Sequence, residues 1–356
     1  MDDMRKAAAP LVIRGPLDLA GAVPYLLGFH PSRSLVAVGC GGPHGTCALR
    51  FGLPLSGKAA HHLAALLACH DFTAALLVGY GSAEEAEPAV AAAREALSTA
   101  GLQVREALRV ESGRYWSYLC DAPGCCPPEG TPLTTTPLEA KAVLDGLVAH
   151  PDRSALAATL APVTGAAREL MRAETLRAEA RAAAPPFAAR AGLKLVRETI
   201  ARALRGEAFP APREVAELTV ALASLRVRDE AWVLIAPDEL SAHLALWRHV
   251  MTHAEPRYLP APACLFAYAV YLSGDGGLAN LALDRSDEAD PGYSMSTLLR
   301  QALLSGLHPS DARITLTPED LAVAYDDPPE TKASLAGRTP VTRWSKLGDV
   351  GHRVRG

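Results

Sequence analysis

Three of the seven cysteines of this chain lie in residues 114–130, and their spacing could bind a metal ion. Cys120, Cys125 and Cys126 read C-x4-C-C on a segment rich in proline and glycine, and zinc takes four tetrahedral sulfur or nitrogen ligands. A fourth ligand would have to come from elsewhere, for instance from the C-x3-H-x2-C pattern of residues 40–47. The alternatives are redox-active or nucleophilic thiols, and buried cysteines that pack as small apolar side chains. We expect no cofactor, with zinc at these three cysteines as the alternative.

The residues before these cysteines form an aromatic strand pattern. In a strand Arg114, Trp116 and Tyr118 share one face, so they would make a cation–aromatic surface suited to stacking a ligand ring. The alternative is a strand whose aromatic side chains pack under the helical part of the protein.

Two loops could hold a ligand at the strand ends. Tyr80 lies in a Gly-Tyr-Gly-Ser segment between an apolar strand and a helix, where backbone N–H groups could bind an anion. Glu84 and Glu85 in the first turn already complement the helix dipole, which argues against a phosphate. His30 could act as a general base beside Ser34, or could cap the preceding helix.

A charged segment precedes Trp232 farther along the chain. Arg228, Asp229 and Glu230 could form an internal ion pair between two helices, or could line a groove. No complete catalytic constellation is present, so no catalytic residue is assigned. The candidate ligand-binding residues are His30, Tyr80, Arg114, Trp116, Arg228 and Asp229.

The elements that must position these residues fall into two parts. Residues 11–137 alternate strand and helix patterns, which predicts an α/β domain with a mixed sheet. Expected strands cover 34–39, 46–53, 73–78, 102–110 and 114–119, and expected helices cover 17–27, 57–69 and 82–99, with Pro24 shortening or kinking the first.

Residues 138–306 have almost no strand pattern, so we predict an all-α domain there. The residues from 260 to 291 resemble one tetratricopeptide-like helix pair, and the alternative is an ordinary helical hairpin. We expect residues 1–10 to be disordered and 307–356 to form an extended linker and a disordered basic tail. The expected helices cover 138–150, 154–183, 188–206, 213–225, 228–235, 237–253, 262–273, 277–289 and 294–305.

Composition narrows the class of protein. The formal net charge is −4 and the isoelectric point about 6.3, which disfavours nucleic acid or an anionic membrane as partner. Neither a secretory signal nor an apolar run of membrane-spanning length stands out. We therefore expect a cytoplasmic protein.

Several distinctive segments together carry a resemblance to a known family. The chain resembles the actinobacterial family called domain of unknown function 4192 over nearly all of its length up to about Gly306. The family name implies no activity and no catalytic residues. The hairpin with Cys40 and Cys47 does not belong to the resemblance, which weakens a metal site built from it. The segments that carry the resemblance are 24–31, 34–39, 114–130, 227–232, 274–280 and 289–294.

Two hypotheses on function remain. The first is an interaction or adaptor module that binds a protein partner, suggested by the helical units and the missing catalytic constellation. The second is an enzyme or small-ligand-binding protein with its site at the strand ends, which a pocket with perturbed titratable groups would support. The oligomeric state cannot be derived from the sequence.

Overall fold

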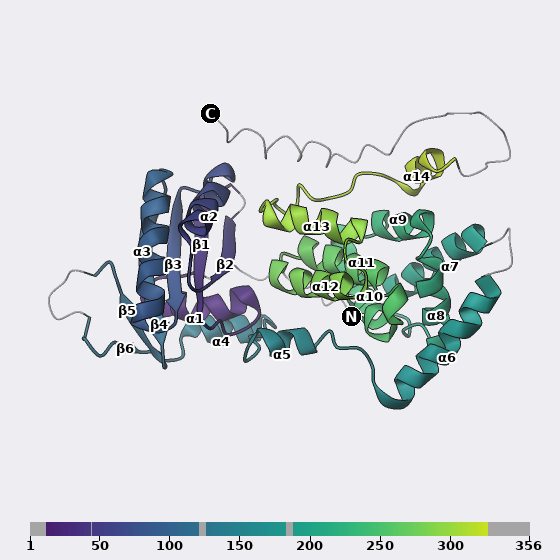
Figure 1. The fold of residues 1–356 in the computed structure, drawn as a ribbon, viewed down its shortest axis with the longest axis horizontal. Coiled ribbons are helices and arrows are strands. Elements are labelled where there is room, and N and C mark those ends of the chain that lie inside the picture. Colours follow the sequence, from purple (N-terminus) through teal and green to yellow (C-terminus); the bar gives the residue numbers. More distant parts are fainter. Residues whose placement is uncertain (1–11, 44, 121–125, 183–187, 327–356) are drawn as a thin grey trace. The chain divides into compact units, whose positions relative to one another are not determined.

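The computed structural model describes residues 12–43, 45–120, 126–182 and 188–326 (Figure 1). The chain divides into two compact units. Unit 1 comprises Met1–Ala161, Val270–Asp284 and Ser296–Ala312, and unit 2 comprises Pro162–Ala269, Arg285–Met295 and Arg313–Gly356. The helices α11 (Pro260–Leu272), α12 (Gly276–Ala289) and α13 (Ser294–Leu304) therefore contribute residues to both units.

Unit 1 is built on a six-stranded mixed sheet, which confirms the predicted fold class of this part. The strand order is β2-β1-β3-β4-β5-β6, and only β3 and β4 pair in parallel. The strands are β1 (Ser34–Gly42), β2 (Gly45–Gly52), β3 (Ala74–Tyr80), β4 (Gln103–Glu111), β5 (Arg114–Ser117) and β6 (Thr131–Pro132).

Helices α2 (Gly57–Cys69) and α3 (Ala83–Thr99) pack on one face of this sheet. Leu35, Leu77, Leu63 and Leu97 belong to the shared core there. The alternate strand residues, which face away from this core, include the fully buried Val78, so the other face is covered as well.

Helix α1 (Pro16–Leu27) contacts β4 and β5 and packs against α4 (Pro137–Leu144). It ends at Gly28, as predicted, because glycine takes the left-handed conformation that follows a helix. Pro24 is buried within the helix, which continues past it to Leu27, so of the two expected effects, a shorter or a kinked helix, the shortening is wrong.

Unit 2 is helical among its described residues, which confirms the predicted class of the second part. It contains α6 (Gly165–Ala182), α7 (Ala188–Leu204), α8 (Pro212–Ala221), α9 (Leu225–Val233), α10 (Leu240–His253), the first part of α11, and α14 (Pro318–Ala324). In α11 the residues from Ala261 to Tyr271 are almost all buried, as expected for a central helix.

Three differences from the sequence analysis are found, and the two that concern helices have local causes. The expected helix 154–183 is two helices, α5 (Arg153–Ala158) and α6, because Pro162 between them has no N–H to continue a helical ladder. Residues 138–161, which we assigned to the helical domain, belong to unit 1. Helix α14 lies in the segment that we expected to be extended, and its Thr317 and Asp320 form a reciprocal capping box.

Candidate functional site

The first candidate region is the end of β3. Ser34 and Tyr80 are directly opposite each other on the antiparallel strands β1 and β3, so their side chains share one face of the sheet. Both residues are buried, and neither hydroxyl oxygen has a hydrogen-bond partner. Burial raises the pKa of Tyr80 strongly, so this phenol is neutral at physiological pH. Two unpaired hydroxyls at a strand end are polar groups that a ligand could use.

His30 lies on the connection between α1 and β1 and is exposed. Its backbone N–H donates to the His150 oxygen at 2.9 Å, and the His150 N–H donates to the Gly28 oxygen at 2.8 Å. These bonds fix the backbone of the loop and leave the imidazole in solvent.

The predicted anion loop at the start of α3 carries a carboxylate. Glu85 pairs with Arg33 at 2.8 Å, and its Oε2 lies 3.1 Å from where a side chain at Gly81 would begin. A negative group therefore already occupies the helix N-terminus, which agrees with the argument against a phosphate there.

Arg114 and Trp116 hold a loop of their own unit. Arg114 Nη1 donates to the Gly130 oxygen at 2.8 Å, and Trp116 Nε1 donates to the Pro128 oxygen at 2.9 Å. Gly130 is necessary at this place, because a Cβ there would lie 2.5 Å from the Trp116 ring. These two predicted site residues are brought together, and both polar groups are engaged with backbone.

The cation that stacks on Trp116 comes from the neighbouring strand. The Arg109 guanidinium of β4 lies 3.7 Å from the centre of the ring, because Arg109 and Trp116 are opposite each other in the β4–β5 ladder. The sequence analysis considered only the side chains of one strand, Arg114, Trp116 and Tyr118, and did not name Arg109.

Cys125 and His44, which the zinc hypothesis invoked, lie outside the described residues. Within the described parts of the chain, no three His, Cys, Asp or Glu side chains are grouped so as to hold a metal ion. Burial raises the pKa of the Cys47 thiol and of Cys40, which makes them poor nucleophiles.

In unit 2, Arg228 and Asp229 form an ion pair with each other within α9, and not one between two helices. Arg228 Nε and Nη2 donate to Asp229 Oδ1 at 2.8 and 2.6 Å, and Nη1 donates to the Tyr293 hydroxyl at 3.4 Å. The Tyr325 hydroxyl, just after α14, donates to Asp229 Oδ2. The pair therefore ties α9 to two other segments of the unit.

Glu230, which the sequence analysis grouped with Arg228 and Asp229, is a second charged group on α9. Glu230 is fully buried, and its two oxygens bind Arg226 Nη1 at 2.6 Å and Arg197 Nε at 2.5 Å. Arg226 is also buried, whereas Arg197 is half-exposed. The i, i+4 spacing of Arg226 and Glu230 was the available signal, but spacing alone does not reveal burial.

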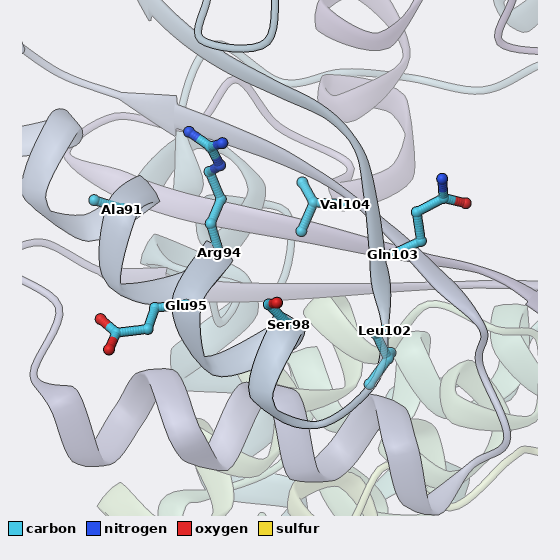
Figure 2. A pocket seen from close by; sticks show the side chains of 7 residues that line it. All are labelled: Ala91, Arg94, Glu95, Ser98, Leu102, Gln103 and Val104. Carbon is cyan, nitrogen blue, oxygen red and sulfur yellow. The ribbon is translucent and has the colours of Figure 1, made fainter.

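Two open pockets are found away from these residues. One of about 520 Å³ lies between the end of α3 and the start of β4, and Figure 2 shows Val104 facing the space beside Arg94. The other, of about 500 Å³, lies between α7 and α10, beside the exposed Phe209. Neither pocket is lined by any of the six candidate ligand-binding residues.

The end of α4 and the turn after it expose four large aliphatic side chains. We call residues 143–148 the apolar turn, after Val143, Leu144, Leu147 and Val148, all of which are exposed. Leu144 is 87% exposed and Val148 62% exposed. Soluble proteins rarely gather such side chains in water without a reason.

Comparisons with known proteins give one match. Residues 16–310 match the family model described as Domain of unknown function (DUF4192). No curated protein and no solved structure matches the chain. None of the described helices has the length and hydrophobicity of a membrane span.

Proposed function

Because the chain belongs to the DUF4192 family, to which no activity is attached, we propose from its geometry that it is a protein-interaction module. The apolar turn of unit 1 is the observation that carries this proposal. Its partner would be a protein with an apolar groove that accepts the four aliphatic side chains.

The apolar turn is a preformed shape. The Leu147 N–H donates to the Ala142 oxygen at 2.9 Å and the Gly146 N–H to the Val143 oxygen at 3.0 Å, so the chain reverses directly after α4. Gly146 has φ +81°, a conformation that glycine adopts without strain. A rigid turn loses little conformational entropy on binding, which favours affinity.

The apolar turn is also attached to the body of unit 1. Thr136 and Glu139 form a capping box at the start of α4, and Ala142 is fully buried. From Val143 to Val148 every residue is exposed. Burial of each large aliphatic side chain in a partner groove is worth about 1.5–3 kcal/mol, so two such side chains can dominate an interface.

The test compares partner binding by full-length variants. Leu144→Ser combined with Val148→Ser removes two exposed side chains, while Leu176→Ser on α6, which is 55% exposed, is the matched control. Affinity purification from the native cell should recover a stoichiometric partner with the wild type and the control. With the double variant, the measured affinity for that partner should fall at least about tenfold.

A partner that binds the double variant as tightly as the wild type would refute the role of the apolar turn. The same holds if no stoichiometric partner is recovered with the wild type. Exposed substitutions change stability by no more than about 0.5 kcal/mol, so misfolding does not confound the comparison.

We also propose a second function, small-ligand binding at the strand ends, which the Ser34 and Tyr80 hydroxyls favour. A small polar compound that pairs with them would raise the melting temperature of the wild type, and Tyr80→Phe would lose this shift. Tyr118→Phe is the matched control, because the Tyr118 hydroxyl is also buried without a partner. A panel of polar metabolites that leaves the wild-type melting temperature unchanged counts against this function.

A cytoplasmic location is a further part of the proposal. The thiols of Cys40, Cys47 and Cys69 are free, which suits a reducing compartment.

A further inference from the structure

Strand β2 forms one edge of the sheet in unit 1 (Figure 1). Its inner side pairs with β1 in one regular register from Gly52 opposite Ser34 to Cys47 opposite Gly39. Its outer side pairs with no other strand among the described residues. An edge of eight residues is long enough to act as a template for another strand.

The register shows which backbone groups face outward. The Leu53 N–H donates to the Arg33 oxygen, and hydrogen-bonded pairs alternate along an antiparallel ladder. The odd-numbered residues of β2, such as Leu49, therefore bond β1. Thr46, Ala48, Arg50 and Gly52 direct their N–H and C=O groups away from the sheet.

The usual protection of an edge is missing from β2. Residues 45–52 contain no proline, no lysine and no acidic residue, and the register shift of the hairpin lies outside the 47–52 ladder, between Gly39 and Gly42. The single charge is Arg50, whose guanidinium lies 5.6 Å from the centre of the Phe29 ring. The charge is thus engaged with its own unit.

We propose that β2 pairs with β2 of a second copy of the chain, antiparallel and centred on Ala48. Because only even-numbered residues face outward, only registers that pair even with even residues satisfy the outward groups of both copies. Centring on Ala48 places Ala48 opposite its equivalent and Arg50 opposite Thr46 of the other copy. Each hydrogen-bonded pair contributes two bonds, so the edge gains about six backbone hydrogen bonds.

The chemistry of the strand favours a second copy as occupant. One two-fold rotation satisfies both identical edges at once, and no like charges meet in this register. The rotation also keeps Cys47 and Leu49 of both copies on the same face of a continuous sheet. This interface is separate from the apolar turn and does not depend on the proposed function.

The first test is sedimentation velocity of the full chain at rising concentration. The wild type should dimerise. Ala48→Pro removes an outward N–H that bonds nothing among the described residues, so it should weaken the dimer at least about tenfold while circular dichroism stays unchanged. A wild type that remains monomeric at about 100 μM overturns the proposal, since that concentration exceeds the Kd of specific interfaces.

The second test does not depend on how well Ala48→Pro folds. In the proposed register, Ala48→Cys places two thiols about 5.5 Å apart by their Cα atoms, within disulfide range. Thr46→Cys is the matched control, because its two thiols would lie about 14 Å apart. Mild oxidation should crosslink Ala48→Cys beyond the wild type. Equal crosslinking of the two variants would refute the register.

Discussion

Replacing Glu230 by Gln tests the account of the charged group on α9. Glu230 is fully buried and binds one buried partner, Arg226, and one partner that is 51% exposed, Arg197. Gln keeps the shape and removes the negative charge, so the Arg226 guanidinium loses its buried counter-charge. Breaking a buried ion pair from one side costs about 3–5 kcal/mol, and the retained amide puts the expected loss near about 3 kcal/mol.

Arg197→Ala is the matched control, because it removes the other ion pair of the same carboxylate. A half-exposed guanidinium is screened by water, so its loss should cost no more than about 1 kcal/mol. For a unit of this size, 1 kcal/mol corresponds to about 2–4 °C in melting temperature. Glu230→Gln should therefore lower the Tm by about 6–12 °C and Arg197→Ala by less than about 4 °C.

Thermal unfolding followed by tryptophan fluorescence measures both variants, since Trp232 lies on the same helix as Glu230. If Arg197→Ala costs as much as Glu230→Gln, burial does not decide the strength of these pairs. If Glu230→Gln costs less than about 1 kcal/mol, the carboxylate is not buried as described.

Three further predictions concern single groups, each measured by chemical denaturation. Gly130→Ala should lower the free energy of unfolding by at least about 2 kcal/mol, because its Cβ would lie 2.5 Å from the Trp116 ring. Gly101→Ala is the control, since Gly101 has a similar φ and open space around it, and it should lower the free energy of unfolding by about 1 kcal/mol. Equal losses in the two variants would contradict the role of the ring. Burial lowers the pKa of His243 to about 4, so the unfolded chain takes up a proton below pH 6.5 that the folded chain does not. The contribution of His243 to the free energy of unfolding should therefore be fully present above pH 6.5 and about 3 kcal/mol smaller at pH 4. His243→Leu should remove this loss between pH 6.5 and pH 4. If the free energy of unfolding of His243→Leu falls with pH as steeply as that of the wild type, the prediction is wrong. Tyr80→Phe should be neutral or stabilise by up to about 1 kcal/mol without ligand, and a loss above about 1 kcal/mol would mean that the hydroxyl has a partner.

Elements whose signals are local were predictable from the sequence. The end of α1 at Gly28 and the β4–β5 hairpin across Ser112 and Gly113 follow from turn residues and apolar spacing. The capping box that starts α14 at Thr317 was equally readable and was missed, because the segment was assigned as extended from its composition.

Features set by the pairing of distant segments were not predictable. Arg109 stacks on Trp116, and Ser34 faces Tyr80, only because of the registers between strands. The burial of Glu230 depends on the packing of α9 with α7, and charged residues are by default expected in solvent. Site residues were therefore chosen one strand at a time, while the contacts that define them cross between strands.

The interleaving of the two units has a consequence for synthesis on the ribosome. Unit 1 needs Val270–Asp284 and Ser296–Ala312, where the Ser305 oxygen lies 2.7 Å from His70 Nε2 and Asp284 pairs with Arg153. The sheet is translated first, yet its unit stays incomplete until Ala312 has left the exit tunnel. Domains generally fold as units during synthesis, N-terminal first. Here the sheet instead precedes, in the order of synthesis, two segments of its own unit that are made only after most of unit 2.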